Sequence, residues 1–132
     1  MPVQYRIDEK LEIVRGSASG VIDVHDVSKA FSELVIATNG RALYLPLLFR
    51  AEDTALHHKM DFASLELSKE KIKALRKLYP GTGRVRNAMI VPDSIKDPVG
   101  PMWKAMIAAD PSLGIDVEVF ATEESAIAWL KS

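Results

Sequence analysis

The order of strand-like and helix-like segments is the feature that most constrains the fold. Apolar residues at every second position indicate strands, and apolar residues three and four positions apart indicate helices. The chain reads as two strands followed by helix, strand, helix, strand, helix, strand and helix. Strands that alternate with helical crossovers are typical of a parallel sheet. We therefore predict one α/β domain over residues 1–132, with a mixed, mostly parallel sheet of 4–5 strands, opened by a β-hairpin, and about four helices.

The clearest strand and helix form the stretch Val117–Leu130, VEVFATEESAIAWL. Its first half alternates as a strand does, and its second half has helical spacing. Thr122 is expected to cap the helix, and the two glutamates that follow place negative charge where the helix dipole favours it. Trp129 is expected to seal the core.

The first half of the chain contains an opening hairpin, a helix and an apolar segment. Strands are predicted at Gln4–Ile7 and Leu11–Arg15, and a helix from Asp23 ends at Asn39-Gly40. The run Arg41–Phe49 is nearly all apolar, as in a buried strand. It contains a proline, which cannot donate to a sheet, so the strand is expected to stop near residue 45.

The second half continues the alternation after a stretch that shows neither period. We expect a loop over Arg50–Leu67 and a helix that Ser68 caps and that ends at Tyr79. A strand at Arg86–Val91 follows, and then a proline-led helix that ends before Pro111. Ligands of such sheets usually lie at the carboxyl ends of the strands.

Composition limits the classes of function. There is no cysteine, which excludes disulfides and suits a reducing compartment, so we expect a cytoplasmic protein. The net charge of −1 gives no reason to expect binding to nucleic acid. The longest apolar run, Ala42–Phe49, is too short to cross a bilayer, so no membrane insertion is expected.

Several segments together resemble one family. The segments GVIDVHDV, NAMIV, VGPMWKAM and VEVFATEESAIAWL, in this order, are similar to the SpoIIAA-like group, bacterial relatives of the STAS domain of sulfate transporters and anti-sigma-factor antagonists. The resemblance implies a mixed sheet with helices and covers many members without an assigned activity. Antagonists of that family carry a phosphorylatable Ser or Thr after the third strand. The nearest counterpart is Asp53-Thr54, although the glycine-containing continuation is absent and Arg50-Ala51-Glu52 intervenes.

Two clusters outside this motif are candidate sites. A basic helix face is either solvated or a surface for an acidic protein or anionic head groups, and consists of Lys69, Lys73, Arg76 and Lys77. A set of methionines with a tryptophan forms either ordinary core or a cavity for an apolar ligand beneath the last two helices, and consists of Met89, Met102, Trp103 and Met106.

Catalytic and metal motifs find no support in the sequence. His57 and His58 are adjacent and would point apart, so no metal site is predicted, and no cofactor. No nucleophile is accompanied by a base and an orienting group. Our first hypothesis is a non-enzymatic binding or regulatory module whose partner is an unknown protein or a small apolar ligand. The alternatives are a hydrolase that uses the loop Arg50–Leu67 and a regulator switched by phosphorylation of Thr54. An exposed strand edge would also allow a homodimer.

Overall fold

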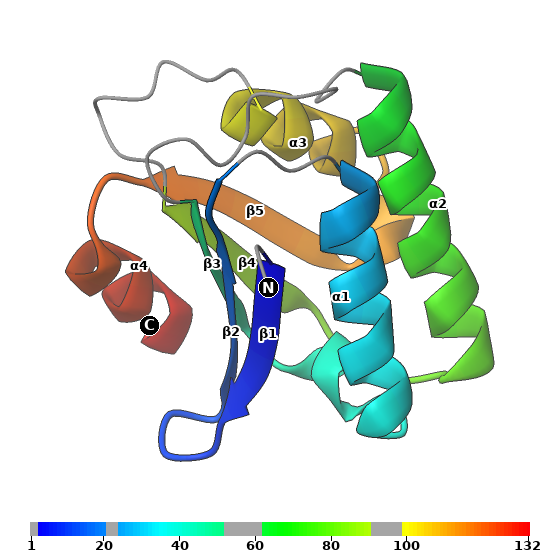
Figure 1. The fold of residues 1–132 in the computed structure, drawn as a ribbon, viewed down its shortest axis with the longest axis horizontal. Coiled ribbons are helices and arrows are strands. Elements are labelled where there is room, and N and C mark those ends of the chain that lie inside the picture. Colours follow the sequence, from blue (N-terminus) through cyan, green and yellow to red (C-terminus); the bar gives the residue numbers. More distant parts are fainter. Residues whose placement is uncertain (1–2, 21–23, 52–61, 91–98) are drawn as a thin grey trace.

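A computed structural model describes residues 3–20, 24–51, 62–90 and 99–132. Its strands form one five-stranded sheet in the order β1-β2-β3-β4-β5, in which β1 and β2 are antiparallel and all later neighbours are parallel (Figure 1). The predicted α/β fold with a mixed, mostly parallel sheet is thereby confirmed. The strands are β1 (Val3–Asp8), β2 (Ile13–Ala18), β3 (Leu47–Ala51), β4 (Val85–Ile90) and β5 (Ile115–Phe120).

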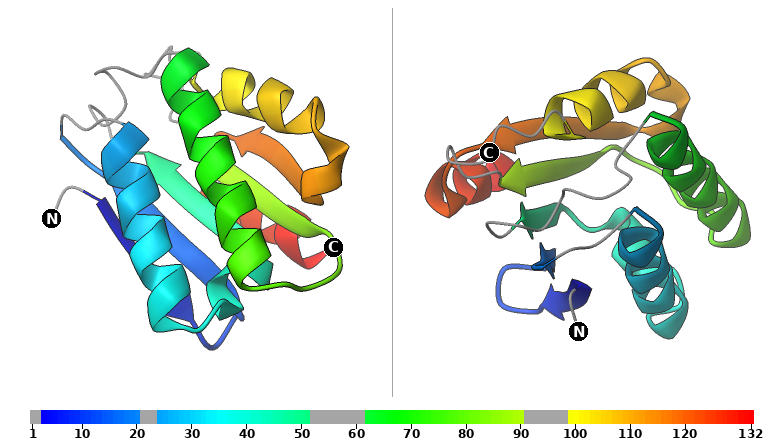
Figure 2. Two further views of the ribbon diagram at one scale, coloured as in Figure 1. Left: turned by 90° about the vertical axis from the view of Figure 1, so that its right-hand side faces the viewer. Right: turned by 45° about the horizontal axis from the view of Figure 1, so that its top comes forward.

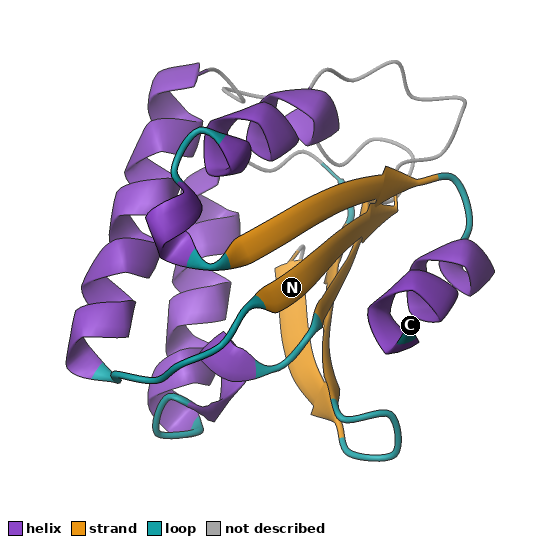
Figure 3. Cartoon of the chain, turned by 180° about the vertical axis from the view of Figure 1, so that it is seen from behind, coloured by secondary structure: helices purple, strands orange, loops and turns teal. Residues whose placement is uncertain are grey.

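The helices cover the two faces of the sheet unequally. Each crossover joins neighbouring parallel strands with the same hand, so the three connecting helices lie on one face. The last helix follows the final strand and covers the opposite face, as Figure 3 shows from behind. The described residues form four α-helices, α1 (Val24–Ala37), α2 (Phe62–Leu78), α3 (Val99–Ala108) and α4 (Glu123–Lys131), and two short 3-10 helices, Arg41–Tyr44 and Pro111–Leu113.

The alternation of side chains along the strands divides the core between these two faces. Ile13 and Val14 are both fully buried neighbours in β2, but Ile13 packs towards α4 and Val14 towards α1 and α2. The cluster against α4 also contains Leu48 and Leu130. Most of the apolar core therefore lies under α1, α2 and α3, and a smaller core lies under α4.

The final helix follows its prediction closely. Thr122 is the N-cap, and its side-chain oxygen accepts a hydrogen bond from the backbone N–H of Ser125 at 3.3 Å. At the other end, the Arg86 guanidinium donates to the backbone carbonyl of Trp129 and lies 5.2 Å from the centre of the indole ring. A cation at a helix C-terminus interacts favourably with the dipole and the last carbonyls. Trp129 packs against Phe120 at the edge of this core, as expected.

The prediction of a strand that starts at Arg41 and stops near residue 45 is wrong, because the strand of this segment begins only after that point. Residues Arg41–Tyr44 form a 3-10 helix, and β3 begins only at Leu47. Ala42 and Leu43 are apolar because the 3-10 turn buries them in the core, which the sequence pattern cannot separate from a strand. Pro46 lies just before β3, where its carbonyl accepts from Val14 N at 2.8 Å and its missing N–H is not needed.

The helix predicted from Ser68 begins six residues earlier, at Phe62. Ser68 is therefore not a cap but lies inside α2, where its hydroxyl accepts a hydrogen bond from Ser28 of α1 at 2.8 Å. Within this added segment Leu65 is buried, whereas Leu67 is exposed. The expected loop over residues 50–67 is thus wrong at both ends, since residues 50–51 belong to β3, and residues 52–61 lie outside the described residues.

Candidate functional site

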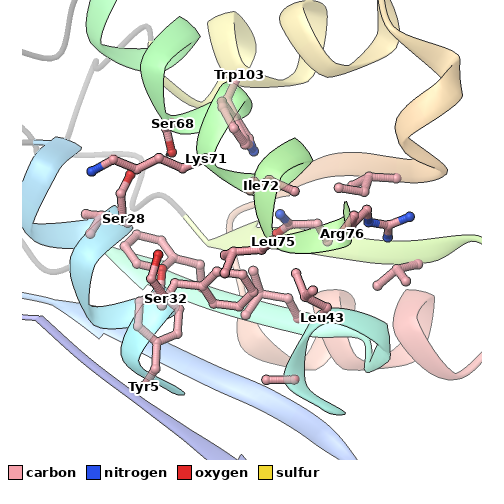
Figure 4. A pocket seen from close by; sticks show the side chains of 18 of the residues that line it. Tyr5, Ser28, Ser32, Leu43, Ser68, Lys71, Ile72, Leu75, Arg76 and Trp103 are labelled. Carbon is pink, nitrogen blue, oxygen red and sulfur yellow. The ribbon is translucent and has the colours of Figure 1, made fainter. Parts of the chain in front are cut away.

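A cavity of about 120 Å³ lies between α1, α2 and the sheet (Figure 4). The two helices run side by side across this face, as the left view of Figure 2 shows. Apolar side chains from both layers form most of the wall, among them Leu43, Phe49, Ile72 and Leu75. The cavity therefore occupies a place where a sheet and two helices would otherwise share a continuous core.

Aromatic rings form the base of the cavity. The Tyr5 ring lies 5.4 Å from Phe31 and 5.9 Å from Phe49, centre to centre. Tyr5 can lie flat over β2 because residue 16 is glycine, and a Cβ there would approach the Tyr5 ring to 2.3 Å. Burial raises the pKa of the Tyr5 hydroxyl above its ordinary value, so the base of the cavity is uncharged at neutral pH.

Short polar side chains line the cavity where α1 faces α2. Ser28 is buried and donates to Ser68 across the two helices, and Ser32 lies one turn further along α1. The exposed Lys71 reaches the same end of the cavity, next to Ser28 and Ser68 (Figure 4). This end is polar, in contrast to the aromatic base.

An arginine and an asparagine also line the cavity. In the described part of the chain, the buried side-chain polar atoms without a hydrogen-bond partner are Nε and Nη2 of Arg76 and Oδ1 of Asn87. Both residues line the cavity, Arg76 from α2 and Asn87 from β4. Buried polar groups are nearly always hydrogen-bonded, so three such atoms at one cavity call for an explanation.

Tyr44 positions the guanidinium of Arg76. The guanidinium carbon lies 5.1 Å from the centre of the Tyr44 ring, within the range of a cation–π contact. The Tyr44 hydroxyl donates to the backbone carbonyl of Tyr79, and a Cβ at residue 81 would approach the Tyr44 ring to 2.6 Å, so glycine lets this ring pack closely. The arginine is therefore held in place from one side while its Nε and Nη2 atoms lack partners.

The predicted basic face is divided by the structure. Lys73 Nζ lies 2.6 Å from Asp110 Oδ2 and Lys69 Nζ lies 3.8 Å from the same atom, which links α2 to the end of α3. Arg76 turns to the cavity, and Lys77 is exposed. The four residues therefore do not form one continuous basic surface.

The ion pair at Asp110 predicts a pH dependence of stability. Hydrogen bonds from Lys73 and Ser112 hold the pKa of the Asp110 carboxyl below its ordinary value. A carboxyl whose pKa is lower in the folded state stabilises the fold above the unfolded pKa of about 3.9, and this contribution is lost as pH falls through the folded pKa. Asp110→Asn is expected to be less stable than the native chain at about pH 7 and to lose less stability on acidification to about pH 3.

Urea denaturation of both proteins at the two pH values measures this difference. The lysines and the other carboxyls are common to both proteins, so their titration cancels in the comparison. Parallel losses of stability in the native chain and in Asp110→Asn would mean that Asp110 does not contribute in this way.

The predicted methionine and tryptophan set is also divided. Met89 and Trp103 line the cavity. Met106 is buried and Met102 half-buried, and both pack in the cluster under α3 without lining the cavity. The cavity lies beneath α1 and α2 rather than beneath the last two helices, where the sequence suggested it.

Several candidate residues lie outside the described part of the chain. Asp53 and Thr54, proposed as a phosphorylation switch, lie outside the described residues, as do His57 and His58. Within the described ranges, no group of three or more histidines and carboxylates could hold a metal ion. Nor does any described helix have the length and apolar character needed to cross a membrane.

Sequence reasoning missed the residues that define the polar features of the cavity. Arg76 was grouped with the lysines of α2, although it lies four residues after Ile72 and one after Leu75, on the apolar side of the helix. Asn87 lies between Val85 and Met89 at the alternate positions of β4 that face the core. A polar residue at a position that the pattern assigns to the core is the signal that could have found both.

Comparisons with protein-family models, with curated proteins and with solved structures found no match.

Proposed function

We propose that this protein is a binding module that holds a small, mostly apolar molecule in the cavity between α1, α2 and the sheet. The observation that carries the proposal is the cavity itself. Apolar side chains form its wall, and the rings of Tyr5, Phe31 and Phe49, which pack against one another, are among them. An engineered apolar cavity of about 150 Å³ binds benzene, so a volume of about 120 Å³ suits a single ring or a short branched chain.

The polar groups of the cavity favour binding over catalysis. Hydrolysis by a serine needs a base within hydrogen-bond reach and a group that orients this base. Ser28 is instead bonded to Ser68, and no histidine or carboxylate is among the described residues that line the cavity. The hydrolase and phosphorylation hypotheses rest on residues 50–67 and on Thr54, for which the sequence is the only argument.

The biological setting is proposed from the sequence. We propose a relationship to the SpoIIAA-like group and, with it, a bacterial origin, on the segments quoted above. The cysteine-free composition supports a cytoplasmic location. A protein partner or a homodimer remains a proposal, for which the edge strands β1 and β5 are the natural contact sites.

Filling the cavity is expected to abolish binding of a neutral apolar probe. Ile72→Trp places a larger side chain into the cavity, whereas Leu78→Trp introduces the same residue on the same helix at a position that is 73% exposed and outside the cavity. We expect benzene to bind the native protein and Leu78→Trp alike, and Ile72→Trp at least about tenfold more weakly.

Two-dimensional NMR titration with benzene measures both the affinity and the place of binding. The shifted amide signals should cluster on the segments that wall the cavity, around Phe49 and Leu75. Thermal unfolding of each variant controls for loss of the fold. Equal binding to both tryptophan variants, or no binding to the native protein, would contradict the proposal.

A further inference from the structure

The unpartnered atoms of Arg76 form one edge of its guanidinium. Nε and Nη2 lie on the same side of the group, so that their N–H bonds point in nearly the same direction. This fork matches the two oxygens of a carboxylate, which it binds through two parallel hydrogen bonds. Both atoms belong to a residue that lines the cavity, but they have almost no exposed surface, so a ligand meets them only when the Arg76 side chain shifts towards the cavity.

The charge of Arg76 lacks a compensating anion among the described residues around the cavity. Those lining residues include two cations, Lys71 and Arg76, and no aspartate or glutamate. The Tyr44 ring compensates the charge only in part. Arg76 is half-buried, and a charge that is partly removed from water without a counterion carries a cost, so an anion that binds it removes a cost that a neutral molecule leaves in place.

Asn87 adds a third unpartnered polar atom at the cavity. Its side-chain oxygen is buried without a partner, and the residue reaches the cavity from β4, whereas Arg76 reaches it from α2. A half-turn of the amide exchanges its acceptor for a donor. Asn87 can therefore accept from a hydroxyl on the ligand or donate to a carboxylate oxygen.

We propose that the cavity selects small aromatic or short-chain monocarboxylates, whose carboxylate is bound by Nε and Nη2 of Arg76. This inference rests on the proposed function and names the class of its ligand. The apolar body of the ligand lies against Leu75 and the aromatic base. Lys71 lies at the other end of the cavity, next to Ser28 (Figure 4), so it is not the group that binds the carboxylate.

Benzoate and benzamide test the inference without any variant. They have nearly the same shape and differ in charge, and hydrogen bonds to a charged group are about twice as strong as neutral ones. Calorimetric titration of the native protein near neutral pH is expected to show benzoate binding about tenfold more tightly than benzamide. Equal affinities would overturn the inference, and the benzene titration would still report separately on the proposed function.

Three variants and one control variant locate the group that binds the carboxylate. Arg76→Met is expected to lose the preference for benzoate while it still binds benzene, and Arg76→Lys, which keeps the charge without the fork, should retain only part of it. Lys71→Met should keep the preference, as should the matched control Lys77→Met, which removes an exposed charge of the same helix.

The stability of Arg76→Met separates a binding role from a structural one. Because methionine removes a half-buried charge that has no compensating anion at the cavity, this variant is expected to unfold at the same temperature as the native chain or at a higher one. A preference for benzoate that is lost in Lys71→Met and kept in Arg76→Met would show that the carboxylate lies at the other end of the cavity, and would overturn the assignment.

Discussion

Replacing Gly40 with alanine is expected to lower the free energy of unfolding by about 3 kcal/mol. Gly40 follows α1 with a φ of 87°, in the left-handed region, and its N–H donates to the carbonyl of Val35 at 2.8 Å. An added Cβ would also lie 2.6 Å from the Cβ of Tyr79. This atom is fixed to the backbone and cannot rotate away, so the left-handed conformation and the collision act together.

Gly83→Ala is the matched control for this prediction. Gly83 also has a positive φ, of 99°, but a Cβ there would meet nothing within 4 Å. Its replacement is expected to cost only the conformational strain, about 1 kcal/mol. Urea denaturation of the two variants measures the difference, which isolates the contact with Tyr79. Equal losses would mean that α1 and the end of α2 separate easily at this point.

Replacing Ile13 with alanine is expected to destabilise the protein by about 3 to 4 kcal/mol. Ile13 has no exposed surface and packs with Leu48, Ala126 and Leu130 between the sheet and α4. Truncation removes buried apolar contacts and leaves a cavity in a cluster that one short helix covers. We expect the midpoint of urea unfolding to fall accordingly.

The control for this prediction is Ile36→Ala on the outer side of α1. Ile36 is 61% exposed, so the same truncation should change the free energy of unfolding by less than about 0.5 kcal/mol. A loss below about 1 kcal/mol for Ile13→Ala would mean that α4 does not cover this face in solution.

The sequence predicts the fold where the local signals agree with the tertiary structure. Thr122 caps α4 as expected, and β5 forms where the alternating run predicted a strand. The prediction for the segment Arg41–Phe49 failed because an apolar run fits either a buried strand or a buried turn, and only tertiary packing decides between them. The start of α2 was missed because its first two leucines do not share one face of the helix: Leu65 is buried, whereas Leu67 is exposed. No longer run of apolar residues at helical spacing precedes them in the sequence.

The candidate site was harder to predict than the fold. A long cation among lysines on a helix usually extends into solvent, so the direction of Arg76 depends on the Tyr44 ring beside it, which comes from a distant turn. The place of the cavity likewise depends on how α1 and α2 meet, through Ser28 and Ser68. Such long-range pairings leave no local pattern in a single sequence.

A crystal structure of the protein soaked with benzoate tests the central claim most directly. The account predicts density for one benzoate between α1, α2 and the sheet, with each carboxylate oxygen about 2.7 to 2.9 Å from Nε or Nη2 of Arg76. Density for water alone at Arg76 and Asn87, or an Arg76 paired with a carboxylate side chain of the protein itself, would contradict it.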